Sequence, residues 1–166
     1  NTVTAHPETI DSTSKLYYIA LDKTAGDRSG NPSHDSLIKV FQETSMKEEE
    51  KIFKGILFCP GDPELKAIKL RSHKLSAEYS RTNEDDVEIR RNLAQLILCE
   101  FGEGSFMQGP VFFHYGKHTK IGKRCFFNYN LTIQDDAPVT IGDDNNFGPN
   151  VTIVTPVHPM LPEERR

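Results

Sequence analysis

Bulky apolar residues recur at every sixth position in the last third of the chain. The series runs through Ile121, Phe127 and Ile133, then steps two residues further and resumes at Ile141, Phe147 and Ile153. A period of six fits neither an α-helix nor an alternating strand, whose periods are about 3.6 and 2. It predicts a left-handed parallel β-helix, in which each six-residue unit forms one side of a triangular coil. Each inward side chain then stacks on its equivalent in the next coil.

Two amphipathic segments precede this repeat. Asp62, Pro63 and Glu64 predict a helix start, because aspartate caps free N–H groups and proline has none to lose in the first turn. Helical spacing then defines two apolar faces: Leu65, Ile68, Leu75 and Tyr79 in the first segment, and Ile89, Leu93, Leu96 and Ile97 in the second. Two short helices cannot bury both faces alone, so we expect them to pack against the β-helix.

The pattern divides the chain into three regions. Residues 1–45 are rich in Ser, Thr, Asp, Gly and Pro, have no assigned function and are expected to be flexible. Residues 46–104 are expected to form a small α-helical domain, and residues 105–166 the β-helix. Only about two full coils fit in that space, whereas stacked repeats need about three units to bury a continuous core. We therefore expect that C-terminal coils are missing from this sequence.

Composition excludes several classes of function. The 166 residues carry a net charge of −4 with a pI near 5.9, which gives no electrostatic case for binding nucleic acid or an anionic membrane. No apolar run approaches the roughly 18 residues of a membrane span, and the first residues lack the features of a secretory signal. Three cysteines without CxxC spacing indicate reduced, mostly buried thiols. The cytoplasm fits these features best.

From about Met46 onward the chain resembles the maltose and galactoside O-acetyltransferases, which are sugar-acetylating members of the hexapeptide-repeat acyltransferases. Three segments carry the resemblance in order: DPELKAIKLRSHKLSAEYS, then PVFFHYGKHTKIGKRCFFNYNLTIQDDAPVTIGD, then FGPNVTIVTPVHPMLPEERR. The resemblance implies a homotrimer with active sites between subunits. It implies transfer of an acetyl group from acetyl-CoA to a sugar hydroxyl, without a metal.

The catalytic histidine of that family falls on His158. A sugar hydroxyl is a weak nucleophile near neutral pH, and the pKa of imidazole suits the removal of its proton. The resemblance also places Asn128 at the acceptor site, where an amide would stabilise the developing oxyanion. The alternative for His158 is a solvent-exposed loop histidine without a catalytic role. The alternative for Asn128 is a structural residue at a corner of the coil.

Three further residues are implicated by the resemblance. Asp136 aligns with an aspartate that binds acceptor hydroxyls, although its neighbour Asp135 is an alternative. His114 stands where one family member has an acceptor-contacting serine, which predicts an altered acceptor; the alternative is an ordinary strand histidine without a role in binding. Gly148 has no side chain, so the backbone there could approach the pantetheine arm of acetyl-CoA. The alternative is that Gly148 is only a turn of the coil. Pro60 replaces an acceptor-binding aspartate of the galactoside enzyme, which weakens the case for galactosides.

Two other functions fit parts of the sequence. Trimeric β-helices of the gamma carbonic anhydrase type hold zinc through three histidines, and this chain offers His114, His118 and His158. Against this alternative, position 163 is a glutamate and those enzymes lack the helical domain. The other alternative is a non-catalytic β-helix scaffold with exposed strand edges.

Overall fold

The computed structural model of the protein describes residues 35, 45–158 and 160–165. Apart from Asp35 and Ser45, the region 1–45 that we expected to be flexible lies outside these residues. The chain divides into the units Asn1–Lys51 and Ile52–Arg166, and the fold and site discussed below lie in the second unit.

The helices of the described residues are α3 (Glu48–Phe53), α4 (Pro63–Tyr79), α5 (Val87–Ile97) and the short 3-10 helix η2 (Pro162–Arg165). Helix α4 begins as predicted. The Asp62 carboxylate accepts hydrogen bonds from the backbone N–H groups of Glu64 and Leu65, at 2.9 and 3.0 Å. These bonds satisfy two of the donors that a helix start leaves without an intrahelical partner.

The buried face of α5 differs from the predicted stripe. Its buried residues are Arg90, Leu93, Ala94 and Ile97. Ile89 and Leu96 are about half exposed, so half of the predicted stripe was wrong. The face is rotated because Arg90 packs inward, with its guanidinium over the rings of Tyr79 and Phe106 at 4.7 and 5.0 Å. Cation–π contacts of this kind let a charged side chain occupy a core position.

Nine short strands follow in the described part of the chain: β1 (Glu100–Phe101), β2 (Phe106–Met107), β3 (Val111–Phe113), β4 (Thr119–Ile121), β5 (Phe126–Phe127), β6 (Leu131–Gln134), β7 (Val139–Ile141), β8 (Asn146–Phe147) and β9 (Thr152–Val154). They form three parallel sheets, with the orders β1-β4-β7, β2-β5-β8 and β3-β6-β9. Each strand therefore pairs with its equivalent in the next coil. This topology confirms the predicted left-handed parallel β-helix.

The residues predicted to point inward do so. Phe127 and Ile133 are fully buried, and Ile141 is nearly so. Phe147 and Ile153, in the last coil, are partly buried and pack against the same core. The rings of Phe127 and Phe147 stack in parallel with centroids 4.6 Å apart. The six-residue period therefore identified the core of the coils.

The two-residue step in the repeat is an enlarged corner of each coil. Ile121 pairs with Phe101 of the coil before and with Ile141 of the coil after, so both coils have the same length. The inward residues of successive strands are six positions apart on two sides of each coil. On the third side they are eight positions apart, and the two additional residues fall in the connections from β3 to β4 and from β6 to β7. We call these segments, 114–118 and 134–138, the enlarged corners.

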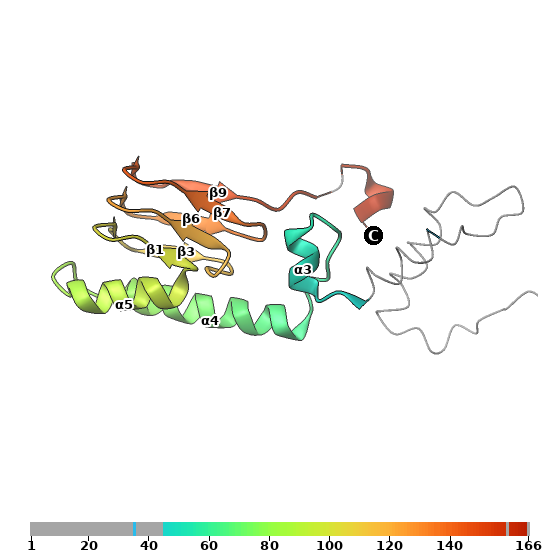
Figure 1. Cartoon of the computed structure of the whole chain (residues 1–166), viewed down its shortest axis with the longest axis horizontal. Helices are drawn as coiled ribbons and strands as arrows, with labels where there is room; N and C mark the ends of the chain where they lie inside the picture. Colours follow the sequence, from blue (N-terminus) through green and yellow to red (C-terminus); the bar gives the residue numbers. More distant parts are fainter. Residues whose placement is uncertain (1–34, 36–44, 159, 166) are drawn as a thin grey trace, which may run out of the picture. The chain divides into compact units, whose positions relative to one another are not determined.

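Helices α4 and α5 cover the first coil, and β9 lies at the far end of the stack (Figure 1). Two buried hydroxyl groups fasten α4 to the coil: Ser72 donates to the Phe113 carbonyl at 2.9 Å, and Tyr79 donates to the Met107 carbonyl at 2.6 Å. Helix α5 ends at Ile97 and the coils begin with β1 at Glu100, which is earlier than the boundary expected at residue 105.

All three cysteines are free, as expected, but only Cys125 is buried; Cys59 is partly exposed and Cys99 is exposed. None of the helices in the described residues combines the length and apolar character needed to cross a bilayer.

Candidate functional site

The second enlarged corner presents two adjacent carboxylates with different roles. Asp135 is fully buried, and its oxygens accept hydrogen bonds from the Tyr115 backbone N–H at 2.7 Å and the Thr119 hydroxyl at 2.8 Å. Asp135 therefore holds successive coils together. The Asp136 carboxylate instead borders a cavity, and its Oδ2 is buried without a hydrogen-bond partner among the described residues. Of the two alternatives, Asp136 is the one with binding capacity left.

The cavity beside Asp136 has a volume of about 470 Å³. It lies between the loop that follows α3 and the segments that follow β6 and β9. Its lining residues are Ile52, Gly55, Ile56, Leu57, Phe58, Asp136, Ala137, Thr155, Pro156, Val157 and His158. The structure thus brings two of the predicted site residues, Asp136 and His158, to one cavity. We call it the His158 cavity.

The loop that carries His158 is anchored where it leaves β9. The Thr155 hydroxyl donates to the Gln134 carbonyl at 3.0 Å and accepts from the Ala137 N–H at 2.8 Å. Thr155 therefore ties the start of this loop to the enlarged corner that contains Asp136. Beyond this anchor His158 is exposed. Functional side chains are commonly carried by loops whose ends are held by a rigid scaffold.

A group of imidazoles lies next to Asp136. His114 Nε2 is 4.0 Å from Asp136 Oδ1. Burial lowers the pKa of His114, an effect that Asp136 opposes and Lys69 reinforces. On α4, burial likewise lowers the pKa of His73, and the neighbouring His114 and Lys69 lower it further. The two imidazole centroids are 5.5 Å apart. The sequence analysis missed His73, because a histidine within an amphipathic helix carries no motif.

Asn128 and Gly148 lie at a different corner from the His158 cavity. Asn128 sits between β5 and β6, where its side-chain oxygen accepts a hydrogen bond from the Tyr129 N–H at 2.8 Å. Gly148 occupies the equivalent corner of the next coil, and a Cβ there would meet nothing within 4 Å. Asp136 and His158 instead follow β6 and β9. A single chain therefore does not bring Asn128 and His158 together.

His118, which belongs to the zinc alternative, is part of the core. It is 4 % exposed, and its Nδ1 lies 2.9 Å from the Asp135 carbonyl oxygen. Its ring stacks on Tyr115 at 4.7 Å and meets the edge of Phe53 at 5.0 Å. Within the described residues, no three His, Cys, Asp or Glu side chains are grouped so as to hold a metal ion.

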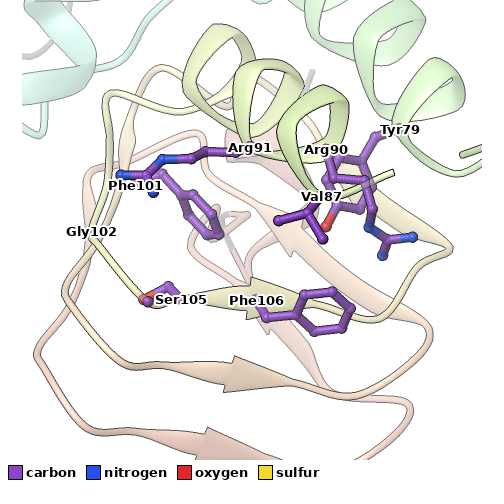
Figure 2. Close-up of a pocket in the computed structure, with 9 residues that line it drawn as sticks. Tyr79, Val87, Arg90, Arg91, Phe101, Gly102, Ser105 and Phe106 are labelled. Carbon is purple, nitrogen blue, oxygen red and sulfur yellow. The ribbon is translucent and has the colours of Figure 1, made fainter. Parts of the chain in front are cut away.

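A second cavity, of about 240 Å³, lies between α5 and the first coil. Figure 2 shows Arg90 beside Tyr79 at this cavity, with Phe106 of β2 below them. Both hydroxyl groups that line it are engaged with the backbone, since Tyr79 donates to Met107 and Ser105 donates to Gly122. The described lining residues include no histidine or carboxylate. The His158 cavity is therefore the stronger candidate for chemistry.

The chain was compared with protein families, curated proteins and solved structures. No protein-family profile matches the chain. A galactoside O-acetyltransferase of Escherichia coli K12 is 38% identical over 125 residues, which are 74% of this chain and 60% of the relative. A maltose O-acetyltransferase from Clostridium difficile 630 matches with a TM-score of 0.70 and 27% identity, covering 73% of this chain and 65% of that one. A hexapeptide-repeat acetyltransferase from Vibrio cholerae O1 biovar eltor, solved with acetyl-CoA, matches with a TM-score of 0.66 and 30% identity, over the same shares.

The stacked parallel coils after a helical region are the fold of the hexapeptide-repeat acetyltransferases that the chain matches. Within that class, the aligned part of the chain is related to the maltose and galactoside O-acetyltransferases, which confirms the resemblance seen in its motifs. The chain spans less than two thirds of the length of these relatives.

Proposed function

We propose that the protein is an acetyl-CoA-dependent O-acetyltransferase that acts on a sugar hydroxyl in the cytoplasm. The observation that carries the proposal is the shared cavity of Asp136 and His158 at the corner of the coils. The names of the relatives support the same activity: the E. coli protein acetylates galactosides, and the V. cholerae structure holds acetyl-CoA.

The proposed reaction needs one proton acceptor and one oxyanion donor. The acceptor hydroxyl oxygen attacks the thioester carbonyl of acetyl-CoA while the His158 imidazole takes its proton. The Asn128 amide donates a hydrogen bond to the carbonyl oxygen as negative charge develops there. When the tetrahedral intermediate collapses, the C–S bond breaks, and the CoA thiolate recovers the proton from His158. The products are the acetyl ester and free CoA.

Asp136 and His114 are the proposed acceptor contacts. An ionised carboxylate accepts hydrogen bonds from sugar hydroxyls, and the partnerless Oδ2 of Asp136 has capacity for one. His114 lies 4.0 Å from the other oxygen, which is too long for a direct hydrogen bond. A hydroxyl between the two groups would donate to the carboxylate and accept from the imidazole. Burial favours the neutral imidazole at this position, because it lowers the pKa of His114.

The proposed assembly is a homotrimer in which Asn128 and Gly148 of one subunit complete the site of its neighbour. The separation of these residues from His158 within one chain supports this assembly, since the reaction needs both sets together. A closed ring of three identical contacts satisfies that requirement for every subunit. Gly148 would admit the pantetheine arm of acetyl-CoA, because the space beside its backbone is open.

The direct test is acetyl transfer by the purified protein. Incubation with acetyl-CoA and a panel of maltose, glucose and galactosides should release free CoA thiol, and mass spectrometry should find the acetylated sugar. Thiol release without any acetylated sugar, or no release with any acceptor, would refute the proposal.

A further inference from the structure

The cavity between α5 and the first coil contains a buried positive charge without a negative partner. Arg90 is only 5% exposed, and the exposed Arg91 lines the same cavity. Neither arginine forms an ion pair with a carboxylate among the described residues. Glu84 borders a neighbouring hollow that Arg90 also lines, but its carboxylate is engaged by the Gln108 amide. Because arginine does not lose its proton in proteins, the cavity stays positively charged.

The guanidinium of Arg90 is held in place, yet one of its donors is unused. Its Nη2 donates to the Met107 carbonyl, and its Nη1 donates to the Thr82 carbonyl at 3.5 Å. The rings of Tyr79 and Phe106 pack against it. Its Nε is buried and has no hydrogen-bond partner among the described residues. An unpaired donor on a buried charged group is costly, so an acceptor supplied by a ligand would be stabilising.

The rest of the cavity is suited to a flat apolar group. Val87, Phe101 and Phe106 contribute side chains to its lining. Figure 2 shows Val87 above Phe106, with Phe101 toward Arg91. The volume is about 240 Å³. Since a cavity of about 150 Å³ can hold benzene, this one has room for a single ring with a small substituent.

We propose that this cavity binds a small aromatic carboxylate, at a site separate from the His158 cavity. The carboxylate accepts a hydrogen bond from Arg90 Nε and attracts the mobile side chain of Arg91 over the opening. The ring of the ligand lies among Val87, Phe101 and Phe106, where contacts between aromatic rings favour it over an aliphatic chain of similar size. The charge of the cavity thus selects an anion, and its apolar lining selects a ring.

Binding of benzoate to the full chain, measured without acetyl-CoA, tests this proposal. Benzyl alcohol keeps the ring and removes the charge, whereas acetate keeps the charge and removes the ring. Titrations followed by saturation-transfer NMR should show benzoate binding roughly tenfold or more tightly than either, as expected for a charge-assisted hydrogen bond and a buried ring. No saturable benzoate binding, or equal affinity for benzoate and benzyl alcohol, would overturn the proposal. Equal affinity for benzoate and acetate would indicate an adventitious ion only and would also overturn it.

Two substitutions of Val87 test the role of charge at this cavity. Val87 is 61% exposed at the start of α5, where an acidic residue is favourable, so neither Val87→Asp nor Val87→Asn should impair folding. The two variants differ only in charge. Val87→Asp places a carboxylate on the same helix turn as Arg90 and Arg91, and it should bind benzoate roughly tenfold or more weakly than Val87→Asn does. Equal affinities of the two variants would contradict the proposal.

Three further variants locate the bound ligand. Arg91→Gln should weaken benzoate binding severalfold, whereas Arg81→Gln should not, because Arg81 is an exposed arginine outside the cavity. His158→Ala should bind benzoate as the wild type does. Loss of binding in His158→Ala, with full binding retained in Arg91→Gln, would place benzoate in the His158 cavity and refute the proposal. Since none of these measurements needs turnover, they remain decisive if acetyl transfer fails.

Discussion

His158 is the residue on which the proposed chemistry depends most directly. Its replacement by alanine should lower kcat for sugar acetylation by roughly 10²–10⁴, the usual contribution of a positioned general base. Acetyl-CoA binding should change little, because the imidazole acts on the acceptor hydroxyl. Steady-state kinetics and calorimetric titration with acetyl-CoA measure the two quantities. The acidic limb of the kcat/KM profile should also disappear. A His158→Ala protein with near wild-type turnover and the same acidic limb would exclude His158 as the base.

The half-buried imidazoles of His73 and His114 should make folding stability depend on pH. Their native pKa values lie below the ordinary 6.5, mainly through burial, so the unfolded chain binds more protons than the native state just below that pH. The free energy of unfolding should therefore fall as the pH drops through about 6.5 toward the native pKa values. Urea denaturation between pH 7.5 and about 5.5 measures this slope.

The His73→Gln and His114→Gln variants should each flatten that acidic slope. Above pH 7 both groups are neutral in both states, so the slopes of wild type and variants should agree there and serve as the control. An unchanged acidic slope in both variants would show that other groups set the pH dependence. Glutamine keeps a polar side chain of similar size at each position, which limits the loss of packing.

At the scale of elements, equivalent glycines of successive coils differ in their surroundings. A Cβ on Gly122 would lie 2.7 Å from the Gly142 carbonyl carbon and 2.8 Å from the Asp143 backbone nitrogen, so the backbone would have to shift. A Cβ on Gly142 would meet only the Asn145 amide nitrogen, at 3.9 Å. Gly122→Ala should therefore destabilise the protein by about 1–3 kcal/mol, the usual cost of overpacking. Gly142→Ala should have little effect.

Thermal or urea unfolding of the two glycine variants checks this difference. Since both substitutions add the same methyl group after an inward isoleucine, the comparison isolates the contact between coils. Equal destabilisation by the two variants would contradict the close stacking of the Gly122 and Gly142 turns.

The coils could be predicted from sequence more completely than the helices. A hexapeptide period reports directly which side chains stack inward, and Phe127 and Ile133 are fully buried as predicted. The helical stripe was less informative, because a count of apolar residues cannot anticipate that Arg90 packs against two aromatic rings. Ile89 was consequently placed on the wrong face. Helix faces are set by the partner surface, which hydrophobic spacing alone does not describe.

For the proposed site, the motifs pointed to polar residues only, and the apolar residues beside them came from the structure. Asp136 and His158 line one cavity, and the hydrogen bonds of Asp135 explain why the carboxylate of its neighbour Asp136 is available. The apolar run from Ile56 to Phe58 gave no indication of a site, because nothing in the run itself shows that it faces the corner after β6. Only the fold places these segments on two sides of one cavity.

At the scale of the whole molecule, the separation of Asn128 from His158 predicts a shared site. The active protein should sediment as a trimer, at about three times the chain mass of 18.8 kDa. Asn128→Ala and His158→Ala should each be nearly inactive. Equal amounts of the two, unfolded and refolded together, should recover roughly one quarter of wild-type activity, because sites between unlike subunits regain both residues. A site contained in one chain would recover none, and that outcome, or a fully active monomer, would refute the trimer.

The enlarged corners carry a consequence for how such an enzyme diversifies. Two sides of every coil keep the strict six-residue spacing and so preserve the stack, while the third side contains residues that the spacing does not constrain. His114 and Asp136 occupy this side in successive coils, and the loop to His158 leaves from the same side. Substitutions at positions 114 and 136 therefore alter the proposed acceptor groups while they spare the buried Tyr115, His118 and Asp135 of the same segments. Selection for a new acceptor can therefore act at these positions nearly independently of selection for stability.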